Sequence, residues 1–546
     1  MKYGLRFLGL LLLCGPVLGQ DKRPNIIIMM ADDMGFSDVG CYGGEIQTPN
    51  IDALATKGLR FTQFRNSSRC CPTRASLMTG LYPHQVGLTR NRHSLTRDGV
   101  TIAEALKESG YHTAMVGKWH LSKTLTLNGS DHQKWLDHQI EHGPFGPIES
   151  YPANRGFEKF YGIIWGVINY FDPFSLVEGT EPVKEVPEDF YLTDAITDKA
   201  IEYISEFSKS DKPFFLYYSQ CAPHWPIHAL PEDIAKYKET YKEGWEVLRA
   251  KRYQRQLDMG LFDKAVTPLP TIMGKEKTWA QLTKQEKAFN SRKMAVHAAM
   301  IDRVDQNLGR LLEQLKSFGK FENTVFFFLS DNGASPEITG GPGYDRTSQT
   351  RQGQKVLYGN TIPTELLGSE LSYTGIGSKW ANASNTPFRF WKKESYEGGC
   401  NTPFIVHWPK GLKQKGFVDV QGHVIDLMPT CLDLAQANYP RSFQGQKRLG
   451  LEGQSLMDVI NGTVTTGQTT HCFEHMGGRA VVSGDWKIVA MAKAKKWDLY
   501  HLSKDLTETQ NLAAQFPDKV KELSDVWQRW ADRVGALAAP QKRRGK

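Results

Sequence analysis

Four short segments of the chain are almost wholly apolar, and each lies beside a cluster of polar residues. These segments span residues 25–30, 213–219, 325–329 and 403–407. Strands that are apolar on both faces are typical of a parallel sheet that helices cover on both sides. The pattern therefore predicts buried strands in the interior of one large, mostly parallel sheet.

Helical spacing of apolar residues appears between these segments. Residues 51–57 and 102–109 predict short helices, and residues 294–316 predict a long one. The long segment carries an apolar stripe formed by Met300, Val304, Leu308, Leu311 and Leu315. Strands that alternate with helices predict an α/β fold, a large sheet sandwiched by helices.

The pattern changes near residue 440. Residues 479–490 and 496–502 resemble strands joined by tight turns, and an amphipathic helix is expected after Pro517. We therefore expect an α/β catalytic domain over residues 21–440 and a smaller α+β subdomain, an antiparallel sheet plus a helix, over residues 441–540. Residues 235–290 are polar and irregular, which is typical of an insertion.

The N-terminal residues 1–20 have the features of a secretory signal peptide. Lys2 and Arg6 precede a short apolar core at residues 7–13. A buried N-terminal strand is the alternative, and lipid attachment at Cys14 is a minor option. No later segment approaches the roughly 18 apolar residues of a membrane helix. We expect an exported protein, periplasmic or extracellular, without stable membrane insertion.

Charge and cysteine content narrow the class of protein. The net charge is +8, but two bases lie in residues 1–20 and four in the tail, residues 541–546. The folded body is therefore close to neutral, and no nucleic-acid partner is predicted. The eight cysteines are scattered without CxxC pairs, which indicates neither a zinc ribbon nor a small disulfide scaffold. The short signal and this cysteine pattern favour a bacterial periplasm over a eukaryotic host.

Two pairs of residues with carboxylate or amide side chains follow predicted strands. Asp32 and Asp33 come after residues 25–30, and Asp331 and Asn332 come after residues 325–329. Ligands of α/β sheets bind beyond the carboxyl ends of the strands, so we expect these pairs to share one site. An all-oxygen ligand set suits Ca²⁺, with Mg²⁺ as the less favoured ion, rather than zinc. Either pair alone is more often a helix cap or a turn.

The segment CCPTRASLMTG, residues 70–80, resembles the signature of the formylglycine-dependent sulfatases, members of the alkaline-phosphatase-like superfamily. The signature is Cys-x-Pro-x-Arg followed by two apolar residues and Thr-Gly. Its spacing selects Cys70 rather than Cys71, while Thr73 and Arg69 are mild departures. The resemblance implies that a separate maturation enzyme oxidises Cys70 to formylglycine, which faces the metal ion. A buried cysteine that caps a helix is the alternative interpretation.

The resemblance also implies a reaction. A hydrated aldehyde carries two geminal hydroxyls, and one of them attacks sulfur and expels the alcohol. The second hydroxyl then loses its proton, so the aldehyde re-forms and sulfate leaves. A serine in the same place would keep the sulfate as a covalent ester, because it has no second hydroxyl whose proton loss expels the sulfate.

Further motifs resemble the family residue by residue. The stretch 117–121 (GKWHL) implies that Lys118 holds a sulfate oxygen and that His120 bonds the formylglycine hydroxyl. The stretch 222–226 (APHWP) implies that His224 is the general acid that protonates the leaving oxygen. Arg74 is expected to stabilise the hydrated aldehyde.

A second lysine and a possible substrate contact complete the set. Lys392, four residues before Tyr396, matches the family's second sulfate-binding lysine, with Lys393 as the adjacent competitor. Lys118, His224 and Lys392 are thus expected to contact substrate, and His475 is a further candidate near the substrate entrance. Lys118, Lys392, Arg74 and the cation are expected to neutralise the negative charge that develops on the sulfuryl oxygens. Such electrostatic stabilisation is usually the largest contribution to catalysis of this kind.

The resemblance covers residues 25–530 and predicts a secreted, Ca²⁺-dependent sulfatase that acts on an aryl sulfate or a sulfated carbohydrate. A formylglycine-dependent phosphodiesterase or phosphonate monoester hydrolase is the alternative enzyme. A non-catalytic binder of sulfated glycans is the alternative of another class. Trp165, Tyr170 and Trp245 lie in segments that could set specificity, where they either stack on a sugar or belong to the core.

Overall fold

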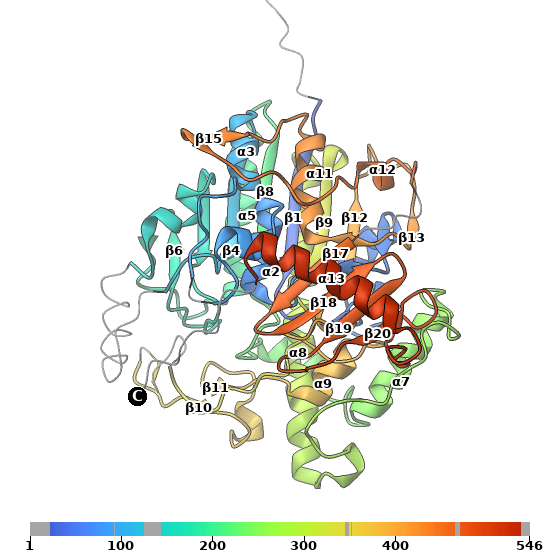
Figure 1. Ribbon diagram of the computed structural model, residues 1–546. Coiled ribbons are helices and arrows are strands. Elements are labelled where there is room, and N and C mark those ends of the chain that lie inside the picture. The colour runs from blue at the N-terminus through green and yellow to red at the C-terminus, as the bar shows by residue number, and fades with distance from the viewer. Residues whose placement is uncertain are drawn as a thin grey trace, which may run out of the picture.

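A ten-stranded sheet forms the centre of the computed structural model (Figure 1). The structure describes residues 22–91, 93–124, 144–343, 349–350, 352–464 and 470–536. The expected signal peptide and the basic tail lie outside the described residues. The strand order is β13-β2-β12-β9-β1-β8-β4-β5-β6-β7. The strands are β1 (Asn25–Ala31), β2 (Leu59–Phe61), β4 (His112–Lys118), β5 (Lys159–Ile163), β6 (Leu176–Glu178), β7 (Glu181–Pro182), β8 (Phe214–Ser219), β9 (Thr324–Ser330), β12 (Phe404–His407) and β13 (Gly416–Val418).

The middle of the sheet is parallel, and its margins are mixed. Strands β9, β1, β8, β4 and β5 pair in parallel, with Ala31 opposite Ser330 at the ends of β1 and β9. Strand β12 runs antiparallel to both β9 and β2, and β6 and β7 are antiparallel as well. The predicted fold class is confirmed, and the strand at 403–407 is an antiparallel member of the sheet. An apolar run indicates burial on both faces but does not indicate direction.

Two groups of helices pack beside the sheet. One group is α1 (Pro49–Thr56), α5 (Leu192–Phe207) and α8 (Lys284–Ser317), and the other is α2 (Cys70–Thr79), α3 (Ile102–Glu108) and α11 (Leu427–Leu434). Helix α8 begins ten residues before the predicted start. Thr283 accepts a hydrogen bond from the amide of Glu286, whose side chain bonds back to the Thr283 amide. This capping box, and not the apolar stripe, sets the start of the helix.

The C-terminal part is a four-stranded antiparallel sheet covered by one helix. Its strands are β17 (Thr470–His475), β18 (Gly478–Ser483), β19 (Trp486–Ala490) and β20 (Asp498–His501), paired in that order. Figure 1 shows the red helix α13 (Pro517–Val534) lying across these orange strands. Leu523, Trp527 and Trp530 of α13 join Val481 and Ile488 in a hydrophobic core of their own. The expected antiparallel sheet plus helix is therefore present.

Smaller elements complete the described chain. Three two-stranded ladders are β10 (Leu357–Tyr358) with β11 (Ser372–Tyr373), β14 (Gly422–His423) with β3 (Phe64–Arg65), and β15 (Ser442–Phe443) with β16 (Gln446–Lys447). Further helices are α6 (Pro231–Lys236), α7 (Trp245–Asp258), α9 (Ser378–Ser384), α10 (Glu397–Cys400) and α12 (Met457–Ile460). None of the helices in the described part of the chain has the length and apolar content needed to span a bilayer.

The aromatic residues considered for sugar stacking belong to the core. Trp165, Tyr170 and Trp245 are all buried, and Trp245 packs edge-on against Trp279 and Trp380. The interpretation of these three side chains as a stacking surface is wrong, because none of them has a free face for a ligand.

Candidate active site

The predicted site residues converge at one edge of the sheet. Strands β9, β1, β8 and β4 are adjacent and parallel, so their carboxyl ends meet at the same edge. Asp331 follows β9, Asp32 follows β1, His224 comes after β8, and Lys118 is the last residue of β4. Parallel pairing thus brings together side chains that are far apart in the sequence.

The acidic pairs form one buried cluster. Asp32, Asp33, Asp331 and Asn332 are all at most 2% exposed. The amide nitrogen Nδ2 of Asn332 donates to Asp33 Oδ1 at 2.7 Å, and the backbone N–H of Asp33 donates to Asp331 Oδ1 at 3.3 Å. The four residues that the sequence proposed as metal ligands are therefore neighbours.

This cluster has the properties of a cation site. The oxygens Asp32 Oδ1 and Asn332 Oδ1 are buried and have no hydrogen-bond partner, although buried acceptors are normally satisfied. Burial, the adjacent carboxylates and incomplete compensation by Lys118 and Arg74 raise the pKa of Asp32 well above its usual value. Burial likewise raises the pKa of Asp331. An oxygen-preferring divalent cation would satisfy the free acceptors and relieve the repulsion, so these residues fit such an ion.

Two buried lysines that are far apart in the sequence contact the cluster. Lys118 Nζ donates to Asp32 Oδ2 at 2.5 Å, and Lys392 Nζ donates to Asp33 Oδ2 at 2.8 Å. Burial lowers the pKa of each lysine, but the adjacent carboxylates outweigh it and raise both above their usual value. The neighbouring Lys393 is partly exposed instead and pairs with Glu337. Of the two competing lysines, only Lys392 lies at the cluster.

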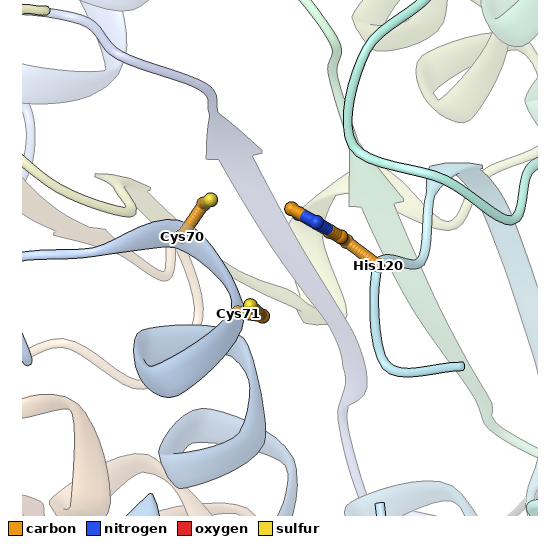
Figure 2. Close-up of side chains that lie close together, drawn as sticks. All are labelled: Cys70, Cys71 and His120. Atoms are coloured by element: carbon orange, nitrogen blue, oxygen red, sulfur yellow. The ribbon is translucent and has the colours of Figure 1, made fainter. Parts of the chain in front are cut away.

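Cys70 is the first residue of α2, and its charge is among those that act to raise the pKa values of Asp33 and Asp331. Figure 2 shows Cys70 at the start of this helix and the ring of His120 extending toward it from the loop after β4. One ligand atom each of Cys70, Cys71 and His120 lies within 4.8 Å of the others. The Cys71 thiol, followed by His120, Lys118 and Lys392, lowers the pKa of Cys70 well below its usual value despite burial. The chain therefore stabilises negative charge at position 70, as helix N-termini do.

Arg74 lies one helical turn after Cys70 and holds α2 against three strands. Its Nε donates to Asp331 Oδ2 at 2.9 Å, and its Nη1 donates to the Lys118 carbonyl oxygen at 2.8 Å. Nη1 also donates to Ser219 Oγ at 2.5 Å. The guanidinium thus connects the ends of β9, β4 and β8, which fixes the position of Cys70 relative to the acidic cluster.

His224 contacts the cluster through one ring nitrogen. Its Nδ1 lies 2.5 Å from the carbonyl oxygen of Trp225, and its Nε2 lies 3.2 Å from Lys392 Nζ and 3.4 Å from Asp33 Oδ2. Burial lowers the pKa of His224 to about 3. The carbonyl contact assigns the proton to Nδ1 in the neutral ring, so Nε2 is the nitrogen that faces the site.

His475 is the last residue of β17 and the one predicted site residue that comes from the C-terminal sheet. Both of its ring nitrogens are buried without a hydrogen-bond partner. Burial lowers its pKa to about 4, with smaller electrostatic contributions from Arg69, Glu474, Cys70 and Lys393. Cys70 is thus among the charged groups that act on the pKa of His475, while His475 forms no side-chain hydrogen bond with any described residue.

Two residues near the site were not predicted. Glu337 bonds Arg69 Nη1 at 3.0 Å and Trp225 Nε1 at 3.0 Å, and it lies 3.5 Å from Lys392 Nζ. Its partners are remote in sequence, so no local motif signals it. Gly166 faces the ring of His120, where a Cβ would lie 2.2 Å from Cε1. A lone glycine in a loop gives no such signal either.

Comparison with known proteins supports one family for this arrangement. The sulfatase family model matches residues 24–437, and the model of the N-sulphoglucosamine sulphohydrolase C-terminal region matches residues 388–529. An uncharacterized sulfatase of Schizosaccharomyces pombe is 33% identical over 95% of this chain and 96% of its own length. The arylsulfatase of Klebsiella aerogenes is 31% identical over 82% of this chain and 94% of its own.

A solved structure shares the fold at lower identity. The protein BT4656, solved in complex with its substrate D-glucosamine-2-N,6-O-disulfate, is 22% identical with a TM-score of 0.61. The match covers 95% of this chain and 100% of that chain. The family models and the relatives over 30% identical agree: the chain belongs to the sulfatase family and is a sulfuric ester hydrolase.

Proposed function

We propose that the protein is an exported, Ca²⁺-dependent sulfatase that hydrolyses a sulfate monoester of a carbohydrate or an aryl alcohol. One observation carries the proposal: Cys70, two buried lysines and a buried oxygen cluster with free acceptors lie at one edge of the sheet. The sugar disulfate named as the substrate of BT4656 favours a carbohydrate ester. Residues 1–20 would direct export, residues 21–440 would form the catalytic domain, and residues 441–540 would form the subdomain.

Cys70 is the proposed site of conversion to formylglycine by a maturation enzyme. Its aldehyde hydrate would supply one hydroxyl that attacks sulfur and a second whose proton loss releases sulfate. Every residue of α2 is buried. A second enzyme has no access to Cys70 in the folded chain, so we expect the oxidation to precede folding.

The oxygen cluster is the proposed metal site, held by Asp32, Asp33, Asp331 and Asn332 with position 70 as a further ligand. Calcium is preferred because the donors are carboxylate and amide oxygens, which suit hard cations. The bound ion would supply positive charge next to the sulfuryl oxygens and lower the pKa of the hydroxyl at position 70.

The remaining residues have separate proposed roles. Lys118 and Lys392 hold sulfuryl oxygens, since each ammonium already lies within hydrogen-bond distance of the cluster. His120, close to Cys70, bonds the hydroxyl at that position. Arg74 fixes the position of the nucleophile relative to Asp331 through its hydrogen bond to that carboxylate.

His224 is the proposed general acid, through Nε2. Its Nδ1 is fixed by the Trp225 carbonyl oxygen, so the ring cannot turn Nε2 away without losing that hydrogen bond. A negatively charged sulfate at the site would favour the protonated ring and so raise the pKa of His224 from its low value. His475 is proposed as a substrate contact, because its two ring nitrogens are available for hydrogen bonds.

Peptide mass spectrometry and a turnover assay test the proposal together. Protein produced with a maturation enzyme should show the aldehyde in the peptide 69–74 and should release sulfate from 4-nitrophenyl sulfate. The Cys70→Ala variant should lose turnover by at least about a thousandfold, as expected for loss of a nucleophile. An unmodified thiol in fully active protein, or an active Cys70→Ala variant, would contradict the mechanism.

A further inference from the structure

A groove of about 830 Å³ lies on the C-terminal sheet, outside the acidic cluster. Its walls are the loop after Pro83–Val86, the turn between β17 and β18, and helix α13. Six of its lining residues carry the argument and define what we call the C-terminal groove: His84, Arg90, Glu474, Arg479, Trp497 and Trp527.

The floor of the C-terminal groove is aromatic. The rings of Trp497 and Trp527 lie 5.8 Å apart, and the guanidinium of Arg479 lies 4.5 Å from the centre of the Trp497 ring. Trp497 is partly exposed, unlike Trp165, Tyr170 and Trp245 of the main domain. Flat aromatic faces beside polar groups present an apolar surface together with hydrogen-bonding groups, which suits a sugar ring.

The groove is lined by two arginines and two carboxylates, and the two kinds of side chain differ in whether they already have partners. Neither Arg90 nor Arg479 forms an ion pair with any described residue; Arg479 donates only to the carbonyl oxygen of Ala494, at 3.1 Å. The acidic side chains are already engaged. Glu474 accepts from the backbone N–H of Gly477 at 2.8 Å and lies 2.8 Å from His84 Nε2. Two unpaired arginines above an aromatic floor therefore favour an anionic ligand.

Asp525, the other acidic residue of the groove, is engaged as well. Its Oδ2 accepts from Lys521 Nζ at 2.7 Å, one turn earlier on α13. Partial burial also lowers the pKa of Arg479, because no anion offsets the lost hydration. A bound sulfate or carboxylate would provide that missing counter-charge.

The groove adjoins the candidate active site on two sides. Asn91, next to Arg90, accepts a hydrogen bond at 2.7 Å from Cys71, which is next to the nucleophile. On the other side, Glu474 lines the groove, and the charge of Cys70 acts on the pKa of the following residue, His475. Glu474 and His475 are adjacent residues of β17, so the end of this strand borders the groove.

We propose that the C-terminal groove is a subsite for a second anionic sugar residue, one that carries a sulfate or a carboxylate. The sugar whose ester is cleaved lies at Cys70, and the adjoining residue of the same oligosaccharide lies on Trp497 with its anionic group on Arg479 and Arg90. This inference rests on the proposed function, and it makes a multiply charged oligosaccharide a better substrate than a small aryl sulfate.

Binding to a turnover-deficient protein tests the groove directly. Full-length Cys70→Ala protein with Ca²⁺ is titrated calorimetrically with sulfated tetrasaccharides prepared from heparin and from chondroitin sulfate, with cellotetraose, and with inorganic sulfate. We expect at least one sulfated tetrasaccharide to bind more tightly than cellotetraose and more tightly than inorganic sulfate. Arg479→Gln and Trp497→Ala, each added to Cys70→Ala, should weaken that binding about tenfold.

Controls separate a groove effect from a folding effect. Arg90→Gln alters an exposed loop side chain and should weaken binding in the same direction, whereas Arg529→Gln, on α13 but outside the groove, should not change it. Absence of binding by both sulfated tetrasaccharides, equal binding of cellotetraose, or binding unaffected by Arg479→Gln and Arg90→Gln would overturn the inference.

Kinetics of the matured enzyme distinguish this inference from the proposed function. Arg479→Gln should leave kcat/KM for 4-nitrophenyl sulfate within about twofold and raise KM about tenfold for the tetrasaccharide that binds. A wild-type enzyme that releases no sulfate from any of these compounds contradicts the proposed function, while the binding experiment still decides the groove. Equal KM values for wild type and variant contradict the groove alone.

Discussion

Lys392 and Lys393 are adjacent in sequence, yet they have different environments. Lys392 is fully buried and contacts Asp33 and His224, whereas Lys393 keeps 41% of its side chain exposed and pairs with Glu337. Preorganised charge in a water-excluded site is worth far more than charge at the surface. Only the buried lysine should therefore matter for the chemical step.

Replacing each lysine by methionine compares the two at nearly constant side-chain volume. We expect Lys392→Met to lower kcat/KM for sulfate ester hydrolysis by about 100- to 1,000-fold, the usual loss for one preorganised donor. Lys393→Met should change it by less than about threefold. Steady-state kinetics on matured protein provide the measurement. The reverse order of effects would assign the sulfate-binding role to Lys393.

Gly166 provides a second test at the scale of single atoms. A Cβ at this position would lie 2.2 Å from Cε1 and 2.4 Å from Nε2 of His120, so the ring would have to move. Gly166→Ala should therefore reduce turnover at least about tenfold, since small misplacements of catalytic groups are costly. Its thermal midpoint should stay close to that of Gly340→Ala, whose Cβ meets open space. Equal activity of both variants would show that His120 has no positional role.

Single residues of the site differ in how well the sequence predicts them. Cys70, Lys118 and His224 lie in short local motifs, so the chain itself identifies them. Glu337 is 268 positions from its partner Arg69, and its role arises only when the loop after β9 folds against α2. Long-range contacts of this kind leave no local pattern, because each partner alone resembles a solvated charge.

At the scale of elements, a buried charge cluster joins the main domain to the C-terminal sheet. Glu397 of α10 lies 3.0 Å from Arg65 Nη2 of β3 and 2.7 Å from Lys487 Nζ of β19. Lys487 Nζ also lies 2.8 Å from Glu508. All four side chains are fully buried, so each depends on the others for compensation of its charge.

Removing the negative charge of Glu397 should destabilise the contact between the main domain and the C-terminal sheet. We expect Glu397→Gln to lower the free energy of unfolding by about 3–5 kcal/mol at pH 7, because buried cations lose their partner. Urea denaturation followed by tryptophan fluorescence measures the difference. Glu178→Gln, which removes a half-exposed partner of Lys199, is the control and should change stability by less than about 1 kcal/mol.

The same variant has a defined pH dependence. Burial raises the pKa of Glu397, but Arg65 and Lys487 outweigh it and lower that pKa from 4.5 to about 2. A carboxylate with a lowered pKa stabilises the fold fully above its unfolded pKa and loses that effect as pH falls through the folded value. The difference between wild type and Glu397→Gln should thus be greatest above about pH 4.5 and shrink toward pH 2. A constant difference across this range would exclude the charge as its cause.

The elements themselves were predictable to the extent that burial determines them. The apolar runs identified β1, β8, β9 and β12, because fully buried strands need apolar side chains on both faces. The antiparallel direction of β12 was not predictable, since direction depends on the path of the chain between strands. The early start of α8 was readable from Thr283 and Glu286, a spacing that marks a capping box.

At the scale of the whole molecule, the acidic cluster links four strand ends to overall stability. Two buried acceptors have no partner, and the pKa values of Asp32 and Asp331 are raised. The folded chain therefore has unfavourable electrostatic interactions at this edge of the sheet. A ligand that binds only the folded state stabilises it by mass action. The cation should therefore change the stability of the entire domain, independently of any turnover.

Calcium added to chelator-treated protein should raise the unfolding free energy by about 2.7 kcal/mol at a hundredfold excess over Kd. Magnesium should give a smaller increase at equal concentration, because it tolerates irregular oxygen ligands poorly. Calorimetric unfolding with each ion measures both effects. Asn332→Ala removes one free acceptor and should reduce the calcium effect, while Asn461→Ala, in an exposed turn at the end of α12, should preserve it. If millimolar calcium changes the unfolding of neither the wild type nor Asn332→Ala, the cluster at this sheet edge holds no calcium.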